Sequence, residues 1–270
     1  MLTPEELDRI HIVLVRARNP NNIGAAARAM HDFGLRHLRV VNDYPVPFES
    51  ARSAVDASQV VDEAVASASL AEAIADCTLV VGTTAVGERV LQHPLLPLPE
   101  AAPRILAELR RAVDPPGRVA LLFGSEKTGL SNEELSHCNW LLTIPLQHRE
   151  GERHLSLNLG QAVAVCLYEL VREPSAAVHS SSESIPAAEP PAIPAETIIP
   201  AQPASADDLD RLTTLLAETL DRSGYTRRHP ANSDPVQLRR LVRRMSLHAG
   251  DATVWTGVFR QLLFKLRRMD

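Results

Sequence analysis

The sequence predicts an α/β protein with a largely parallel sheet, followed by a small helical domain. Up to residue 172, short apolar runs rich in β-branched residues alternate with helix-like segments, as in strand–helix–strand units. Residues 174–206 hold seven prolines and no glycine among clustered Ser, Ala and Glu, which predicts a poorly ordered linker. Beyond this linker, apolar residues recur at three-to-four spacing, which predicts helices only.

The individual elements follow from these patterns. Strands are predicted over residues 10–15, 37–41, 78–82, 118–123 and 140–144. Helices are predicted over residues 23–33, 70–75, 103–113, 157–171, 207–221, 235–247 and 251–268. Gly34 is a C-terminal stop for the first helix, Asp207 and Asp251 are suitable N-caps, and Pro235 suits a first turn. The predicted boundaries are 1–173 for the α/β domain, 174–206 for the linker and 207–270 for the helical domain.

Composition excludes several classes of protein. The chain has 270 residues, 45% apolar and 23% charged, which indicates a globular protein rather than a disordered or fibrous one. Its three cysteines are far apart and form no CxxC pair, which fits a reducing cytosol better than a disulfide framework or a zinc cluster. The polar, acidic N-terminal segment is no signal peptide, and no apolar run approaches the roughly 20 residues that span a bilayer. We therefore expect a cytoplasmic protein with no membrane association.

The net charge of −5 conceals a division along the chain. Residues 222–268 carry 11 Lys and Arg against two acidic residues, whereas the other residues carry 17 basic and 31 acidic side chains. An acidic body with a basic appendage of this kind indicates nucleic-acid binding. The histidines show no metal-ligand spacing, so no metal site is expected.

Three polar loops follow predicted strands, where ligands collect in parallel α/β sheets. In the first loop, residues 18–28, Asn22 and Arg28 are six residues apart, and the small residues 24–27 permit close approach by a backbone or a ligand. A turn with an Asn N-cap and a solvated arginine explains this loop equally well. In the third loop, Ile144-Pro precedes Ser156, which either caps the last apolar helix of this domain or lies in a backbone stretch that meets a planar ligand.

The second loop, residues 123–134, lacks the contiguous Gly-Lys-Ser/Thr of a phosphate-binding loop, which excludes a P-loop triphosphatase. A dinucleotide-binding GxGxxG is also absent after the first strand. Ser131 and Glu134 form a capping box, which favours a structural role for both. Gly124 directly follows a buried strand, which is typical of close ligand approach, and Glu126 stands beside it.

Together these segments resemble a known family. Asn22-Ile-Gly-Ala-Ala-Ala-Arg28, the segment 123–135, Ile144-Pro and Ser156-Leu-Asn158 are similar to the three ordered motifs of the SPOUT-class RNA 2′-O-ribose methyltransferases, especially the TrmJ type, which modifies tRNA. The resemblance spans residues 10–172 and continues into the C-terminal helices at 220–225, 229–230 and 238–241. It implies an α/β sheet with a deep trefoil knot, a homodimer whose active sites combine both protomers, and S-adenosyl-L-methionine as the cofactor.

The resemblance also implies the site residues. The implied catalytic residues are Asn22, Arg28, Glu126, Ser156 and Asn158. The implied cofactor-binding residues are Thr83, Thr84, Ala85, Gly124, Ile144, Leu155, Ser156 and Leu157. Arg28 matches the family's proposed base, but a guanidinium hardly deprotonates, so stabilising an alkoxide or orienting a phosphate is an equal alternative. Glu126 is expected to position Arg28 or a loop N–H.

The resemblance implies methylation of cytidine or uridine at position 32 of the tRNA anticodon loop. Ser125 stands where some TrmJ-type enzymes carry a second arginine, and Lys127 is no geometric equivalent, which leaves the nucleotide preference open. The expected RNA-binding residues are Arg239, Arg240, Arg243, Arg244, Lys265 and Arg267. The alternatives are a ribosomal RNA methyltransferase, a non-catalytic RNA-binding protein of the same fold and, disfavoured by the missing phosphate motifs, a generic nucleotide-binding enzyme.

Overall fold

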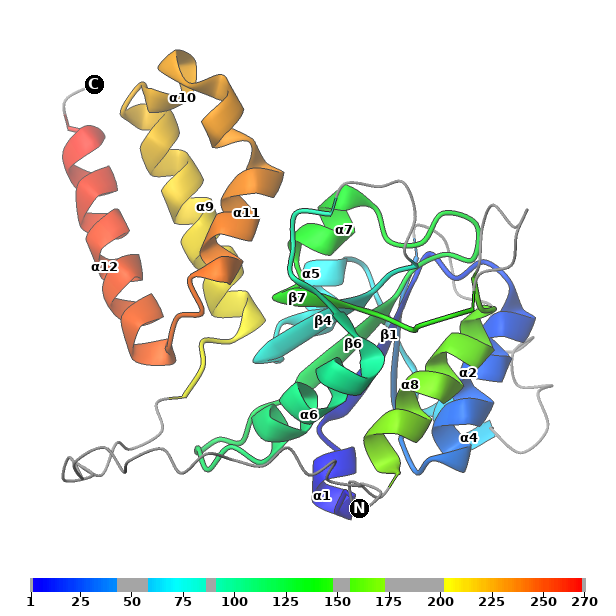
Figure 1. The fold of residues 1–270 in the computed structure, drawn as a ribbon. Helices are drawn as coiled ribbons and strands as arrows, with labels where there is room; N and C mark the ends of the chain where they lie inside the picture. The colour runs from blue at the N-terminus through cyan, green and yellow to red at the C-terminus, as the bar shows by residue number, and fades with distance from the viewer. Residues whose placement is uncertain (1, 43–57, 86–90, 148–155, 173–201, 269–270) are drawn as a thin grey trace, which may run out of the picture.

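A computed structural model describes residues 2–42, 58–85, 91–147, 156–172 and 202–268 (Figure 1). Its centre is a seven-stranded sheet in the order β3-β2-β1-β6-β4-β7-β5, in which every neighbouring pair is parallel. The strands are β1 (Ile10–Val15), β2 (His37–Val41), β3 (Val65–Ser67), β4 (Leu79–Thr83), β5 (Leu95–Pro97), β6 (Val119–Phe123) and β7 (Trp140–Thr143). The predicted α/β class with a largely parallel sheet is confirmed.

The helices are α1 (Pro4–Leu7), α2 (Pro20–Asp32), α4 (Ser58–Asp62), α5 (Leu70–Ile74), α6 (Leu98–Leu109), α7 (Asn132–Ser136), α8 (Leu159–Val171), α9 (Ala206–Arg222), α10 (Tyr225–Arg228), the 3₁₀ turn η1 (Pro230–Ser233), α11 (Pro235–Arg244) and α12 (Ala249–Leu266). None of the described helices is long and apolar enough to cross a membrane.

The five predicted strands lie within one residue of β1, β2, β4, β6 and β7. The two short strands β3 and β5 were not predicted. Each has only three residues and lies at an edge of the sheet, which is too short for an alternating pattern to appear in the sequence.

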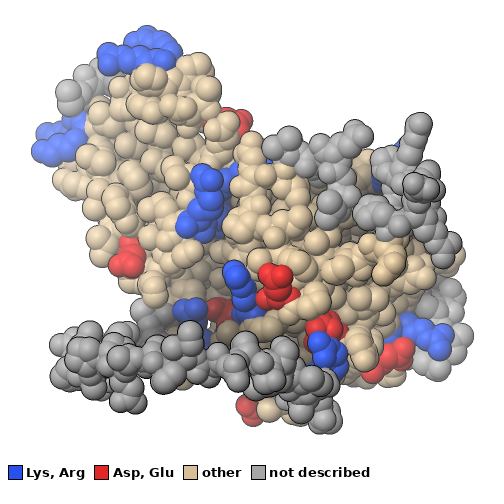
Figure 2. Space-filling view, viewed as in Figure 1, with Lys and Arg blue, Asp and Glu red and all other residues tan. Residues whose placement is uncertain are grey.

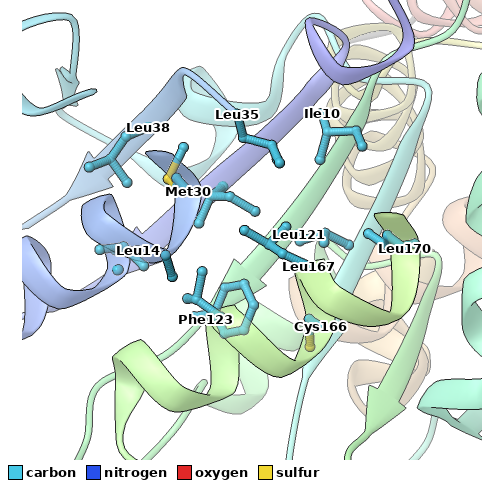
Figure 3. Close-up of a cluster of buried hydrophobic side chains, with 14 of the residues drawn as sticks. Ile10, Leu14, Met30, Leu35, Leu38, Leu121, Phe123, Cys166, Leu167 and Leu170 are labelled. Carbon is cyan, nitrogen blue, oxygen red and sulfur yellow. The ribbon is translucent and has the colours of Figure 1, made fainter. Parts of the chain in front are cut away.

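Alternate side chains of the strands supply two apolar cores, one on each face of the sheet. On one face Leu14, Leu121 and Phe123 pack under α2, α6 and α8 (Figures 1 and 3). On the other face Val13 and Leu122 pack with residues of α5 and α7. The domain therefore has three layers, with the sheet buried between helices.

Several helix ends differ from the prediction because a nearby side chain caps the helix better. Helix α2 begins three residues early, since Asn19 accepts from Asn21 N and Pro20 occupies the first position. Its predicted stop is confirmed, because Gly34 has φ +77° directly after the helix. The N-cap of α8 is Asn158 and not Ser156: the Asn158 side chain accepts from Gln161 N at 2.8 Å.

The C-terminal unit consists of α9, α11 and α12 around a small apolar core: Ala204, Leu209, Leu212, Val242 and Ala252. Asp207 and Asp251 do not cap α9 and α12, since both lie inside the first turn; Ser205 caps α9 and His248 stands at the cap position of α12. The predicted linker extends too far. Ala204 N donates to Leu247 O at 2.9 Å, so this end of it belongs to the helical unit, while residues 174–201 lie outside the described residues.

Candidate functional site

The order of the strands brings the three predicted loops to one edge of the sheet. Strands β1, β6, β4 and β7 are neighbours, and their parallel registers place their carboxyl ends together. The loop after β1 therefore meets the loops after β4, β6 and β7, although these segments are far apart in sequence. In a doubly wound sheet this edge, where the chain reverses its direction of winding, is the usual place for a ligand.

A side-chain hydrogen bond joins the first and second loops. The Asn22 Nδ2 in the first turn of α2 donates to the Glu126 Oε1 in the loop after β6 at 2.7 Å. Because the acceptor is a carboxylate, this bond is stronger than one between neutral groups and orients both side chains. Glu126 was expected to position Arg28 or a loop N–H, but the partner that the structure gives it is the Asn22 amide.

Arg28 lies apart from this pair. Six residues along α2 correspond to about 9 Å of helix axis from Asn22. The Arg28 side chain is exposed, and within the described part of the chain it has no hydrogen bond or ion pair. The structure of one chain therefore leaves this guanidinium free to meet another molecule.

The loop after β6 is closed on itself. Ser125 Oγ and Thr128 Oγ1 are 2.8 Å apart, and Gly129 N donates to Ser125 O at 2.8 Å, with Gly129 at φ +64°. A Cβ atom on Gly124 would lie 2.2 Å from the Gly129 carbonyl carbon. The loop's own backbone therefore explains the glycine, which was attributed above to the approach of a ligand.

Arg16 is a positioning residue that the sequence analysis did not find. It follows β1 with φ +57°, and its guanidinium meets the Glu134 carboxylate in a bidentate pair at 2.7 and 2.9 Å. The same guanidinium donates to Gly129 O at 3.0 Å. Glu134 also accepts from Ser131 N at 2.6 Å, so the predicted capping box of α7 is present. A lone arginine after a strand carries no sequence signal for such a role, because its partners lie more than a hundred residues away.

The predicted cofactor residues line the ends of β4, β6 and β7. The Thr83 hydroxyl donates to Leu122 O at 2.9 Å, and Thr84 N donates to Leu142 O at 3.0 Å, so both residues fix the local backbone. Ile144 and Leu157 are half-buried and Ala85 is exposed. Leu155 lies outside the described residues. The described members of this set carry no charged side chain, which suits a neutral, planar group.

The third loop meets the first through a close contact of two helices. A Cβ atom on Gly160 in α8 would lie 2.7 Å from the Ala25 Cβ in α2. The small residues of α2 are thus explained by the approach of α8 (Figure 1). This contact brings the start of α8 beside the start of α2, which carries Asn22. Asn158 caps α8 there, and the exposed Ser156 precedes it.

The six expected RNA-binding residues divide into two groups. Arg240 and Arg243 are 9% and 2% exposed, and together with Arg239 they contact α7, α9 and Gln92. The guanidiniums of Arg240 and Arg243 are thus occupied by the protein and turned away from solvent, while Arg239 is half-buried. The exposed members are Arg244, Lys265 and Arg267, of which Arg267 pairs with Glu218 at 2.9 Å. Figure 2 shows Lys and Arg gathered at the end of the helical unit that lies away from the sheet.

His11 shows what burial does to a group without a partner. The imidazole is 4% exposed and neither ring nitrogen has a hydrogen bond. Burial, aided by the positive charge of Arg39, lowers the pKa of His11 to about 3. The described residues hold no cluster of His, Cys, Asp and Glu suited to a metal ion, and Cys77, Cys138 and Cys166 are buried and free.

Comparison with known proteins agrees with this geometry. Residues 9–168 match the model of the SpoU rRNA Methylase family. The chain is 33% identical over 265 residues to the tRNA (cytidine/uridine-2′-O-)-methyltransferase TrmJ of Yersinia pestis, covering 98% of this chain and 93% of the relative. It is 35% identical over 253 residues to TrmJ of Escherichia coli O1:K1 / APEC, covering 93% of this chain and 94% of the relative.

Solved structures give the same result. The crystal structure of TrmJ from Z. mobilis ZM4 superposes with a TM-score of 0.72 at 29% identity, covering 93% of this chain and 98% of that one. A putative methylase family protein from Neisseria gonorrhoeae reaches a TM-score of 0.54 at 34% identity, covering 63% of this chain and 85% of that one. The chain belongs to the SpoU rRNA methylase family and is a relative of the TrmJ methyltransferases.

Proposed function

We propose that the protein transfers a methyl group from S-adenosyl-L-methionine to the ribose 2′-hydroxyl of a cytidine or uridine in tRNA. The observation that carries this proposal is the meeting of all three polar segments at the carboxyl ends of β1, β6 and β7, with the first two joined by the bond from Asn22 to Glu126. Family membership supports the methyl transfer, and near full-length similarity to TrmJ relatives supports tRNA as the substrate.

The cofactor site that we propose lies at the ends of β4, β6 and β7. Half-buried Ile144 and Leu157 offer apolar contact to the faces of an adenine ring, and the backbone of 84–85, 124 and 156–157 offers hydrogen-bonding groups to its edge. These neutral residues fit an adenosine. When bound, S-adenosyl-L-methionine supplies an electrophilic methyl group on its sulfonium.

The polar residues of the site have distinct roles in this proposal. Asn22 and Glu126 hold each other and fix the mouth of the site, and Ser156 and Asn158 line it from the start of α8. The attacking 2′-hydroxyl must lose its proton and align with the methyl group. We assign Arg28 to the negative charge that develops on this oxygen, or to the neighbouring phosphate, because a guanidinium stays protonated.

We also propose that the protein is a homodimer in which Arg28 reaches the partner's site, and that its chain forms a deep trefoil knot. Arg28 is exposed and has no partner among the described residues, and α8 exposes Val165 and Tyr168 at 38% and 57% beside α2. An exposed apolar pair beside a site is typical of an interface. The insertion of β7 between β4 and β5, two strands that precede it, supports the knot. Light scattering tests the dimer, and Tyr168→Asp is expected to yield monomers without activity.

Seven of the exposed basic residues of the helical unit are proposed to bind the tRNA backbone. They are Arg227, Arg228, Arg244, Arg260, Lys265, Arg267 and Arg268. Their separation from the sheet leaves room for a folded RNA between the two contact regions. The three free cysteines and a tRNA substrate favour the cytoplasm as the place of action.

Methyl transfer from labelled S-adenosyl-L-methionine to bulk tRNA, with 2′-O-methylation mapped at nucleotide resolution, tests the proposed function. We expect one modified site, at position 32 of the anticodon loop, that disappears with Arg28→Ala. Methylation elsewhere in tRNA corrects the position only. Incorporation into ribosomal RNA alone overturns the substrate, and silence on both RNAs with cofactor binding intact supports a non-catalytic protein.

A further inference from the structure

The helical unit touches the catalytic domain through arginines of α11. Arg239 Nη1 donates to Ser136 Oγ at 2.8 Å, and Arg240 Nη2 donates to Asn132 O at 3.2 Å. Both acceptors belong to α7, the short helix that follows the loop carrying Glu126. Arg239 and Arg240, two of the arginines that give this unit its basic charge, therefore hydrogen-bond to α7.

Arg240 makes a second contact that links two loops of the site. Its Nη1 donates to Gln92 Oε1, in the connection from β4 to β5. Thr84 and Ala85 of the proposed cofactor site stand at the start of this connection, and its residues 86–90 lie outside the described residues. Just beyond Gln92, Pro94 O accepts from Leu141 N of β7 at 2.9 Å, so this end of the connection is bonded to the strand that leads to Ile144. One guanidinium that is 9% exposed thus bridges the cofactor connection and the helix behind the Glu126 loop.

Helix α7 connects the contact with Arg240 to the loop that carries Glu126. Glu134 of α7 caps the helix through Ser131 N and pairs with Arg16, which in turn donates to Gly129 O. The path from Arg240 to the Glu126 loop therefore consists of hydrogen bonds and one short helix. Each bond has a distance between 2.6 and 3.2 Å.

The helix that carries Arg240 is itself fixed to the domain. Arg243, one turn further on, is 2% exposed and lies 3.1 Å from the Asp210 carboxylate of α9. The first N–H groups of α9 donate to the domain: Ala206 N to Cys77 O at 2.8 Å and Asp207 N to Ala75 O at 3.1 Å. These N–H groups have no acceptor within their own helix, so the domain satisfies them. The ion pair to α9 and the bonds from α9 to the domain therefore hold α11, and Arg240 with it, in place.

We propose that Arg240 is a positioning residue for methyl transfer: it fixes Gln92, at the β7-bonded end of the connection from β4 to β5, and α7 relative to each other. The helical unit then contributes to cofactor affinity and turnover in addition to holding RNA. This inference rests on the proposed function, and it assigns to Arg240 a role different from the phosphate contact expected from the sequence.

The test compares Arg240→Ala with Arg244→Ala in the full-length protein. Both variants remove one positive charge from α11, but Arg244 is exposed and, among the described residues, makes no hydrogen bond or ion pair with α7 or Gln92. Calorimetry without RNA gives the affinity for S-adenosyl-L-methionine, and single-turnover kinetics at saturating tRNA give the rate. For Arg240→Ala we expect cofactor affinity and rate to fall by about 5- to 30-fold, with tRNA affinity nearly unchanged. For Arg244→Ala we expect only tRNA affinity to fall.

Gln92→Ala provides an independent arm, because its exposed, neutral side chain is removed without loss of charge. It should lower cofactor affinity in the same way, and the double variant with Arg240→Ala should add little to either single change, since both remove the same bond. If Arg240→Ala does not fold, this variant alone decides. Arg240→Ala that weakens only tRNA binding, or Gln92→Ala with unchanged cofactor affinity, overturns the inference. A wild-type protein that binds cofactor but modifies no RNA overturns the proposed function instead.

Discussion

Arg28 of the catalytic domain and two arginines of α11 in the helical unit are placed in opposite ways. On α2, Arg28 stands exposed at the edge of the site and has no partner among the described residues. On α11, Arg240 and Arg243 are buried and hydrogen-bonded, although this helix belongs to the basic part of the chain. The number of charges in a segment therefore does not say which of them a ligand can reach. The structure divides them into those that dock the unit and those that remain for RNA.

The largest expected effect comes from breaking the ion pair between Arg243 of α11 and Asp210 of α9. Arg243→Met leaves the Asp210 carboxylate without its closest cation, and we expect a loss of about 3–5 kcal/mol in the free energy of unfolding. Urea denaturation measures it. Arg244→Met on the exposed side of the same helix is the control, with an expected change within about 0.5 kcal/mol. Equal effects in the two variants would remove the distinction between docking and free arginines.

Arg28→Lys tests the free arginine. The charge remains, but the planar fork of donors is lost, so we expect the single-turnover rate to fall on the order of 100-fold. Cofactor affinity and the circular dichroism spectrum should stay as in the wild type, because the exposed Arg28 side chain makes no hydrogen bond or ion pair with the described residues. A rate close to that of the wild type would contradict the assignment of Arg28 to the site.

Gly160→Ala tests the contact that brings the third loop to the first. The added methyl would lie 2.7 Å from the Ala25 Cβ, so α2 and α8 must separate, at a cost of about 1–3 kcal/mol in stability. Gly257→Ala is the matched control in α12, where a Cβ meets nothing within 4 Å. This control should gain about 0.4–1 kcal/mol, since alanine favours the helix. Thermal unfolding of both variants separates crowding from helix propensity.

The exposed basic residues predict a smaller, salt-dependent effect. Arg244→Ala and Lys265→Ala should each reduce the slope of log K against log[salt] for tRNA binding by about 0.7–0.9, if each meets one phosphate. Filter binding over a series of salt concentrations measures the slope. Unchanged slopes in both variants would assign RNA binding to another surface.

The smallest expected effect is a loss of stability at acidic pH. Burial alone raises the pKa of Asp210, but His137, Arg243 and Arg239 outweigh it, so the net pKa lies below its usual value. A carboxyl with a lowered folded pKa stabilises the fold above its unfolded pKa of about 3.9 and loses this contribution as the pH falls through the folded value. Urea midpoints should therefore decrease below about pH 4, and Asp210→Asn should flatten this decrease. A parallel decrease in the variant would contradict it.

Sequence reasoning succeeded where the signal is local. The runs at 10–15 and 37–41 are apolar and β-branched, and both strands have the predicted bounds. It was incomplete where the outcome depends on distant partners. No pattern in the sequence marks Arg16 as the clamp of Glu134, or distinguishes buried Arg243 from exposed Arg244 next to it, because only the packing of α11 on α7 and α9 decides this. The N-caps considered for α8 and α9 were wrong for a related reason, since Asn158 and Ser205 compete with equally suitable neighbours.

The place of β6 has a consequence for the growing polypeptide on the ribosome. This strand inserts between β1 and β4, and Ile10 pairs with Val119, more than a hundred positions later. Until residue 123 has left the exit tunnel, β1 and β4 each keep an open edge that is able to pair with foreign strands. Long-range pairing of this kind makes folding slow, so these two strand edges stay open to wrong pairing until the middle strand arrives.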